Sequence, residues 1–461
     1  MFARNLSIGT AVCAALMLAG LVRADVVSDI SMVPQNSNVA LMDDAATMPT
    51  SAPTATAPAA APVTPLNSVL NHIPGYSDTG ISATGYVEGS WTYSAHPPAG
   101  NILTDRSFDT KTESIQFDAI DLAITRGTDG TKAFDIGFTL EQLYGWDADY
   151  IHSNGLALVS NGKTPSAVGP GAGSTATIHP KAQYDLNQAN VVLSFGKVGN
   201  GLTVEGGKFD TLVGYEVIDA PSNPFFSHSY IFAEEPFTQT GLIATYNLTD
   251  PNGPTPLTVT GGMSRGWDQA TEDTNGDVDI MGQLKYVVTN KYSLQFTGIT
   301  GNEQPSGTTD GWRTILDFVG TWTYSDQLTL SANGLFGWQA QDANPLAGPG
   351  AVGGTGVWYG AAAYAKYVLS DYVTLNARAE WFDDNDGGAP TQLAGGPNVG
   401  VPNQFYEVTL GVSIKPLPHD AMLSGLTIRP EGRWDYSDHA AFNGGAQHDE
   451  WTAAIEAYYA F

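Results

Sequence analysis

From about Ser82 to Phe461 the chain repeats one pattern, in which short segments of alternating apolar and polar residues are separated by clusters of Gly, Asn, Asp and Pro. Alternation with a period of two predicts β-strands, because successive side chains of a strand point to opposite faces. No segment with helical periodicity interrupts the series. We predict sixteen strands, at residues 82–93, 112–125, 133–143, 184–195, 202–209, 240–248, 256–266, 278–288, 292–300, 312–324, 327–339, 357–369, 372–383, 404–415, 425–436 and 450–461.

The connections between these segments alternate strictly between long and short. The long connections are 94–111, 144–183, 210–239, 267–277, 301–311, 340–356, 384–403 and 437–449. The short connections are 126–132, 196–201, 249–255, 289–291, 325–326, 370–371 and 416–424. A membrane barrel has this arrangement because its short turns share one rim and its long loops share the other. The sequence therefore predicts an all-β fold, a transmembrane antiparallel up-and-down β-barrel of about 16 strands, at residues 81–461.

Charged residues repeat on one face of the predicted strands and apolar residues on the other. In segment 425–436, Leu426, Ile428 and Trp434 share one face, while Arg429 and Glu431 share the opposite face. In a membrane barrel this alternation places apolar side chains against lipid and charged side chains in the lumen. The predicted inward charges are the acids Glu88, Asp135, Asp279, Asp317, Glu380, Glu407, Glu431 and Asp435 and the bases Lys285, Arg313, Arg378, Lys415, Arg429 and Arg433. One strand departs from this alternation, because the apolar parity of 112–125 slips between Ala119 and Ile120, which predicts a β-bulge.

Tryptophan residues gather at the strand ends that face the long loops. These residues are Trp91, Trp146, Trp267, Trp312, Trp338, Trp358, Trp381, Trp434 and Trp451, whereas Trp322 lies at a short-turn end. Amphipathic rings favour the headgroup level of a membrane. We predict a membrane girdle formed by Trp91, Trp338, Trp358, Trp381, Trp434 and Trp451; tryptophans of an ordinary protein core are the alternative.

The chain before residue 81 lacks the strand pattern. Residues 1–24 are typical of a secretory signal peptide, with Arg4 ahead of an apolar stretch that ends near Ala24. The only cysteine, Cys13, lies within this segment, so no disulfide is predicted for the rest of the chain. Residues 25–80 are rich in Ala, Pro and Thr and are predicted to form a disordered linker, because such a composition cannot bury enough apolar surface to offset its ordering entropy.

Charge and hydropathy exclude two classes of protein. The chain has 19 Lys and Arg against 47 Asp and Glu, a net charge of −28, so it has no basic surface for a nucleic-acid partner. No stretch after residue 24 approaches the roughly 18 apolar residues that a membrane-spanning helix needs. Nucleic-acid binding and a helical membrane protein are therefore excluded.

The last predicted strand carries Trp451, Tyr459 and Phe461 on its apolar face and ends the protein. This resembles the C-terminal signature of bacterial outer-membrane barrels, in which a terminal aromatic residue is read by the assembly machinery. The resemblance implies that Tyr459 and Phe461 form an assembly signal. It also implies the barrel-assembly machinery and outer-membrane lipid as partners, and a location in the cell outer membrane of a Gram-negative-type bacterium.

A series of short motifs lies between residues 206 and 241. They read Gly-Gly-Lys-Phe-Asp-Thr at 206–211, Gly-Tyr-Glu-Val-Ile-Asp at 214–219, Asn-Pro-Phe-Phe-Ser-His-Ser-Tyr at 223–230 and Pro-Phe-Thr-Gln-Thr-Gly at 236–241. The series resembles the OmpL-like family of bacterial outer-membrane β-barrel porins. The resemblance implies a pore, with no defined substrate and no catalytic residue to carry over.

The same motifs occupy the third long connection, which in general porins of sixteen strands folds into the lumen and sets its narrowest point. Carboxylates at such a constriction favour cations by focusing the local field. The predicted constriction consists of the loop acids Asp210, Glu216, Asp219, Glu234 and Glu235, opposed by the strand arginines Arg378, Arg429 and Arg433. The alternative is that these carboxylates only cap loop turns on a solvated surface.

Three other patterns raise chemical alternatives. His439 and His448 lie beside aspartates in the last long loop, but such histidines are usually solvated. The pair His228 and Ser229 invites comparison with a Ser/His enzyme, yet adjacent residues of an extended chain cannot share the required hydrogen bond, and no orienting third group is evident. Residues 272–279 mimic the start of a calcium loop without its essential Gly and Glu positions. We therefore predict no enzyme, no catalytic residue, no metal site and no cofactor.

Together these patterns predict a porin that forms a water-filled channel for passive diffusion of small hydrophilic solutes, with a mild preference for cations. General porins of this size are often trimers, and the connection 144–183 is long enough to latch a neighbour, so a homotrimer is one assembly to test. Two alternatives stay open: a non-conducting structural or adhesive outer-membrane barrel, and an exported glycan-binding β protein whose tryptophans line sugar sites.

Overall fold

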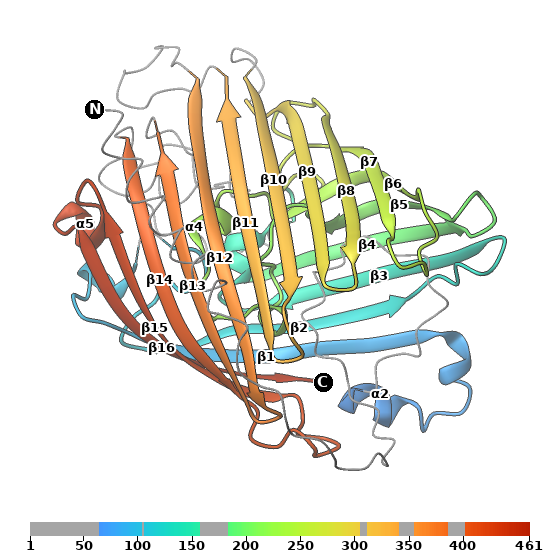
Figure 1. Cartoon of the computed structure of the whole chain (residues 1–461), viewed down its shortest axis with the longest axis horizontal. Helices are drawn as coiled ribbons and strands as arrows, with labels where there is room; N and C mark the ends of the chain where they lie inside the picture. Colours follow the sequence, from blue (N-terminus) through green and yellow to red (C-terminus); the bar gives the residue numbers. More distant parts are fainter. Residues whose placement is uncertain (1–63, 104–105, 157–182, 305–310, 341–354, 386–401) are drawn as a thin grey trace, which may run out of the picture. The chain divides into compact units, whose positions relative to one another are not determined.

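The barrel is formed by sixteen strands among the residues that the structure, a computed structural model, describes: 64–103, 106–156, 183–304, 311–340, 355–385 and 402–461. Each strand pairs in antiparallel fashion with its neighbours along the chain, and β1 (Ile81–Ser94) pairs with β16 (Asp449–Ala460) to close the barrel. Figure 1 shows the strands following one another around the wall. The predicted fold class is confirmed.

The strands between β1 and β16 all lie within three residues of their predicted bounds. They are β2 (Ile115–Arg126), β3 (Asp135–Tyr144), β4 (Tyr184–Phe195), β5 (Leu202–Asp210), β6 (Thr238–Asn247), β7 (Leu257–Ser264), β8 (Asp279–Thr289), β9 (Tyr292–Asn302), β10 (Trp312–Thr323), β11 (Leu328–Gln339), β12 (Gly356–Ser370), β13 (Val373–Asp384), β14 (Asn403–Ile414) and β15 (Leu426–Ser437). The short helices are α2 (Pro65–Leu70), η2 (Ser77–Thr79), η3 (Ala99–Asn101), α3 (Ala148–Ile151), η4 (Ala220–Ser222), α4 (Tyr230–Ala233) and α5 (Phe442–Gly445). None of the helices in these ranges is long and apolar enough to cross a membrane.

The predicted placement of apolar and charged side chains is confirmed. The strands expose apolar side chains on the outside of the barrel and bury charged side chains inside it. Leu410 on β14 and Ile280 on β8 keep 62% and 61% of their surface exposed. On β15, Arg429, Arg433 and Asp435 are all buried. An exposed apolar band around a barrel is the surface that lipid chains cover.

The predicted β-bulge is present on β2. Glu88 of β1 pairs with Ala119, but the next residue, Gly89, pairs with Phe117, so Asp118 is the extra residue. Both Asp118 and Ala119 are buried, whereas the side chains on either side alternate. The bulge therefore restores the alternation that the sequence pattern loses at this point.

The last residue of the chain takes part in closing the barrel. The Phe461 N–H donates to the Gly85 carbonyl at 2.9 Å, and the Gly85 N–H donates to the Phe461 carbonyl at 3.1 Å. Hydrogen bonding between the first and last strands therefore continues to Phe461. An assembly signal at Tyr459 and Phe461 remains a prediction.

The linker prediction is wrong for its last residues. Residues 64–80 contain α2 and η2, and Asn67 is buried there. Thr64 caps α2 by accepting a hydrogen bond from the Asn67 N–H, and the Asn67 side chain accepts one from the Ala83 N–H of β1 at 2.9 Å. This hydrogen bond joins the segment to the barrel wall, which composition alone does not reveal. The signal peptide and the rest of the linker lie outside the described residues.

The tryptophans predicted as a girdle divide into two groups. Trp91 and Trp451 keep 37% and 54% of their surface exposed on the outer face, and Trp338, Trp381 and Trp434 are half-buried on the same face. Their position in a membrane girdle stays a prediction.

The girdle prediction is wrong for Trp358, which is fully buried inside the barrel. Trp358 has the strand parity of the inward residues Ala362 and Tyr364, so its ring points toward the lumen. The long-loop tryptophan Trp267 is also buried, and both rings belong to one apolar cluster. Location at a strand end therefore does not decide which face a ring occupies.

Candidate functional site

The connection between β5 and β6, residues 211–237, is the candidate site, and we call it the lumen loop. A hydrogen bond of 3.0 Å from the Thr211 N–H to the Phe237 carbonyl closes its neck. The loop contains η4 and α4, and the Ser229 hydroxyl caps α4 by accepting a hydrogen bond from the Phe232 N–H. Hydrogen bonds within the short helices pair some of the loop's backbone N–H and C=O groups. Side chains of the barrel wall form hydrogen bonds with many of the others.

The first part of the lumen loop is held by side chains from the inner face of successive strands. The Leu212 carbonyl accepts hydrogen bonds from Gln283 on β8 at 2.7 Å and from Thr297 on β9 at 3.1 Å. The Gly214 N–H donates to Asp317 on β10 at 3.2 Å. These strands lie three to five positions around the barrel from β5. The loop can contact their inner face only by folding into the barrel, as predicted.

Wall carboxylates bind the N–H groups of the second part of the loop. Glu380 on β13 accepts hydrogen bonds from the Tyr230 and Ile231 N–H groups at 2.6 and 2.8 Å. Glu431 on β15 accepts one from the Phe226 N–H at 2.9 Å and one from the following amide at 3.2 Å. These buried carboxylates therefore take the place of water around otherwise orphaned backbone donors.

Wall arginines bind the loop through its acceptors. Arg378 on β13 donates to Glu216 at 2.8 Å and to the Ser227 carbonyl at 2.7 Å. Its Nε also donates to Glu407 on β14 at 3.0 Å. In the same way, Arg429 donates to the Asn223 carbonyl and Arg433 donates to the His228 carbonyl.

The role predicted for these arginines therefore needs a correction. The side chains of Arg378, Arg429 and Arg433 keep only 0%, 4% and 1% of their surface exposed, and each is paired with a carboxylate. A solute in the lumen cannot reach a guanidinium that the loop already covers. The three arginines anchor the lumen loop and do not form an open cationic face of a constriction.

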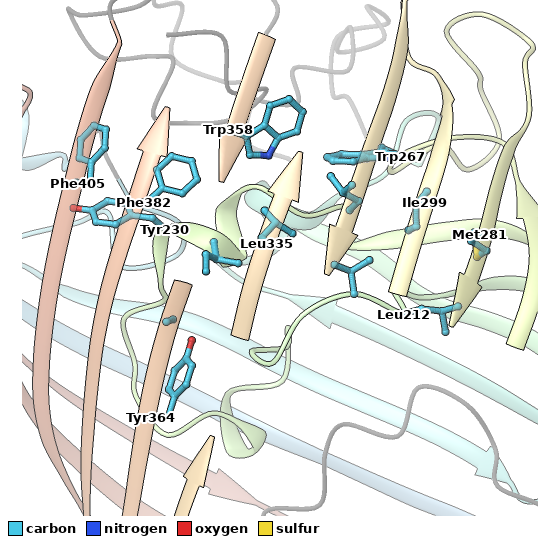
Figure 2. Packing of buried hydrophobic residues seen from close by; sticks show 14 of the residues in the cluster. Leu212, Tyr230, Trp267, Met281, Ile299, Leu335, Trp358, Tyr364, Phe382 and Phe405 are labelled. Carbon is cyan, nitrogen blue, oxygen red and sulfur yellow. The ribbon is translucent and has the colours of Figure 1, made fainter. Parts of the chain in front are cut away.

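Two apolar clusters hold the loop between opposite parts of the wall. Figure 2 shows the first cluster, in which Leu212 and Tyr230 of the loop lie among side chains from the strands. Its strand members include Met281, Ile299, Leu335, Trp358, Tyr364, Phe382 and Phe405. In the second cluster, Ile218, Ala220, Phe232 and Phe237 of the loop pack with Tyr86, Phe108, Ala119, Leu143, Ala148 and Ile151. The lumen loop therefore crosses the inside of the barrel and packs against the wall at both ends of its path. Its side chains occupy part of the lumen.

Glu216 is the most heavily bonded carboxylate of the lumen loop. Besides Arg378, it accepts hydrogen bonds from Tyr364 on β12 at 3.1 Å and from the Ser229 N–H at 2.8 Å, and it lies 3.1 Å from Nδ1 of His228. Burial alone would raise its pKa, but Arg378, His228 and the Ser229 N–H outweigh burial and lower the pKa of Glu216 to about 2. Glu216 is therefore a charged anchor at neutral pH.

We expect this anchor to weaken in acid. A pKa of about 2 against an ordinary 4.5 means that Glu216 contributes stability that is complete above pH 4.5 and lost as the pH falls toward 2. The difference corresponds to about 3 kcal/mol. The measurement is the free energy of unfolding between pH 7 and pH 2 for the wild type and Glu216→Gln. The acid-dependent loss should be smaller in Glu216→Gln, and equal pH profiles would contradict the assignment.

Glu234 and Glu235 behave differently from Glu216. Burial raises the pKa of both, and Asp317 and Glu216 raise the pKa of Glu235 further. Glu235 lies against Gly214, whose φ is +92°, and a Cβ at that glycine would lie 2.1 Å from Oε2 of Glu235. These two acids therefore hold their protons more tightly than exposed glutamates and add less fixed charge than the sequence suggests.

Asp210 and Asp219 join two strand acids that the sequence analysis did not single out. One oxygen each of Asp121 on β2, Glu141 on β3 and Asp219 lies within 4.8 Å of the others. Gln188 on β4 connects Asp210 to this group, because its Nε2 donates to Asp210 at 2.8 Å and to Glu141 at 2.6 Å. The five residues come from four different strands and the loop, and no linear pattern signals their proximity.

Sequence reasoning also missed further contacts. Arg106 in the loop between β1 and β2 bonds Asp435 on β15 at 2.7 Å, and no periodic pattern marks that loop. Glu216 lies beside both His228 and Ser229, so a third group is present, although the structure places it as an acceptor for loop groups. The His439 N–H donates to the Asn403 side chain on β14 at 2.8 Å, and Nδ1 of His448 lies 2.9 Å from the Ser437 carbonyl of β15. The part of connection 144–183 from 157 to 182 lies outside the described residues, so a trimer latch there stays a prediction.

Comparison with known proteins agrees with this architecture. The chain is similar to an anion-selective porin from Comamonas acidovorans, with 12% identity, a TM-score of 0.53 and coverage of 83% of this chain and 99% of that chain. It is also similar to OmpF of Salmonella typhi in complex with daunomycin, with 11% identity, a TM-score of 0.51 and the same coverages of 83% and 99%. No curated protein matches. The family described as "Putative beta-barrel porin-2, OmpL-like" matches residues 80–461, and this chain belongs to that family of β-barrel porins.

Proposed function

We propose that the protein is an outer-membrane porin through which small hydrophilic solutes diffuse passively, with a mild preference for cations. Its family, its closed barrel and its exposed apolar outer face support this function. No catalytic step is part of the proposal. Selection acts through the size of the lumen beside the loop and through the sign of the charges that line it.

The observation that carries the cation preference is an uneven charge distribution inside the barrel. The arginines of β13 and β15 are each paired with a carboxylate. On the side of β1–β5, by contrast, several inward acids have no ion pair within the described residues. They are Glu88, Asp118, Asp121, Glu141, Asp147, Glu205, Asp210 and Asp219. Uncompensated carboxylates in a narrow lumen attract cations and repel anions.

The experiment is a planar-bilayer recording of the detergent-purified protein in a potassium chloride gradient. We expect discrete conductance steps and a reversal potential that indicates cation preference. Neutralising Glu88 and Asp118 with Glu88→Gln and Asp118→Asn should lower the potassium-to-chloride permeability ratio about twofold. Asp326→Asn, which removes an exposed carboxylate at a short turn, is the control and should leave the ratio unchanged. An anion preference in the wild type would overturn the selectivity.

One observation favours a second function. The lumen loop is anchored along β8–β15 and packed by apolar clusters on both sides, as expected for a plugged structural barrel. Such a protein would insert into membranes and give no conductance steps. The same recordings therefore distinguish the porin from a non-conducting barrel.

The outer face and the last strand of the protein indicate its surroundings. We place it in the outer membrane of a Gram-negative-type bacterium, with outer-membrane lipid against its apolar face and the barrel-assembly machinery reading Tyr459 and Phe461. A homotrimer is the proposed assembly. Chemical crosslinking of membranes that yields only monomer would remove the trimer.

A further inference from the structure

A second feature of the lumen is the cluster of Asp121, Glu141 and Asp219, which we call the carboxylate cluster. Asp121 and Glu141 keep only 3% and 4% of their surface exposed. They come from paired strands, since Asp121 pairs with Leu143 and Ala123 pairs with Glu141. Asp219 is contributed by the lumen loop just before η4. The cluster thus brings the loop and the wall of β2 and β3 together.

Some oxygens of this cluster accept no hydrogen bond from the protein, although Glu141 accepts one from Gln188. Among the residues that the structure describes, Oδ2 of Asp121 and Oδ1 of Asp219 are buried and have no hydrogen-bond partner, and the same holds for Oδ1 of the adjacent Asp210. Within the described residues, no lysine or arginine forms an ion pair with Asp121, Glu141 or Asp219. A buried, unpaired carboxylate costs several kcal/mol, so a group of them requires a cationic partner or bound protons.

The geometry matches a calcium-sized ion. Ca²⁺ binds six to eight oxygens at about 2.3–2.6 Å, so its ligand oxygens lie up to about 5 Å apart. The oxygens of the carboxylate cluster lie within 4.8 Å of one another. We propose that Asp121, Glu141 and Asp219 bind one divalent cation of the size of calcium, with Asp210 beside them and water completing the shell.

Other contacts already hold these ligands in place. The Asp219 carbonyl accepts hydrogen bonds from the Ser222 N–H at 3.0 Å and the Asn223 side chain at 3.1 Å. Gln188 donates to Glu141 at 2.6 Å. Such outer partners orient metal ligands before the ion arrives. The bound cation would tie the lumen loop to β2 and β3, opposite the arginine anchors on β13 and β15.

The test is a calcium titration by calorimetry of the full chain in detergent after treatment with EDTA. We expect one site per chain and weaker binding of Mg²⁺, which requires shorter and more regular coordination. Asp219→Asn should weaken calcium binding at least tenfold, about what the loss of a ligand partner costs in other sites. Glu205→Gln, which changes a buried carboxyl on β5 outside the cluster, is the matched control and should bind calcium like the wild type.

The calcium and magnesium titrations can each contradict the proposed site. No calcium binding by the wild type, or equal affinity in the wild type and Asp219→Asn, would overturn the site. Equal affinity for Mg²⁺ would overturn the preference for an ion of the size of calcium. Because Asp219 lies in the lumen loop, Asp219→Asn tests the site without changing a strand of the barrel, and the migration of unheated samples in gels reports folding. Binding is measured without conductance, so its failure and that of the proposed channel are distinguishable.

Discussion

Replacing Arg378 with Met is expected to lower the free energy of unfolding by about 3–5 kcal/mol, because removing one partner of a buried ion pair leaves the other charge uncompensated. Arg378 bonds Glu216 at 2.8 Å and Glu407 at 3.0 Å, and all three side chains are buried. The Ser227 carbonyl loses its donor at the same time. We also expect higher and noisier conductance, because the lumen loop loses a central anchor.

The measurements are denaturant unfolding in detergent and bilayer conductance. Arg378→Met combined with Glu216→Gln should recover part of the stability, since the substituted loop residue no longer carries a buried charge. Arg126→Met is the matched control, because its ion pair with Asp135 is partly exposed and should contribute at most about 1 kcal/mol. If Arg378→Met were no more destabilising than Arg126→Met, Arg378 would not be an anchor of the loop.

Replacing Trp358 with Ala is expected to lower the free energy of unfolding by about 3–5 kcal/mol, the usual cost of removing a large ring from a packed core. The ring is fully buried and lies over Gly337, where a Cβ would approach Trp358 within 2.1 Å. Its indole nitrogen has no hydrogen-bond partner in the part of the chain that the structure describes. Trp358→Phe should therefore retain most of the stability, because it keeps an aromatic ring and removes an unsatisfied donor.

The comparison with Trp451 separates a core ring from a lipid-facing ring. Trp451 keeps 54% of its surface exposed, so Trp451→Ala should cost far less in detergent unfolding. In vesicles that contain brominated lipid, Trp451→Phe should lower the fraction of fluorescence that the lipid quenches, and Trp358→Phe should leave that fraction nearly unchanged. Strong lipid quenching of Trp358 would place its ring outside the barrel and refute the assignment.

The barrel could be predicted almost completely from the sequence. Each strand carries its own signal, because alternation with a period of two is visible within ten residues and does not depend on distant contacts. Even the bulge at Asp118 leaves a local trace, a slip in the parity of neighbouring apolar residues. The parity of 357–369 also carries the information that Trp358 faces inward, which its location at a strand end does not.

The candidate site could be predicted only in part. That the third long connection folds inward followed from a family resemblance, and the residue types at 210–235 indicated an acidic loop. Composition could not show that Glu216 forms an ion pair with Arg378, which lies 162 positions away along the chain. It also could not show that the Glu235 carboxylate packs against the backbone of Gly214. The sequence does not predict the carboxylate cluster, since Asp121 and Glu141 lie on different strands and neither is among the predicted inward charges.

Local periodicity and segment length are enough to predict the number of strands, the face of most side chains and the side on which the long loops lie. Which charges cancel and which remain depends on the folded chain. Electrostatic energy depends on the distance between two groups in space and on their burial, and the lumen loop sets both when it crosses the barrel. It joins Glu216 to Arg378 on one wall and brings Asp219 to Asp121 and Glu141 on the other.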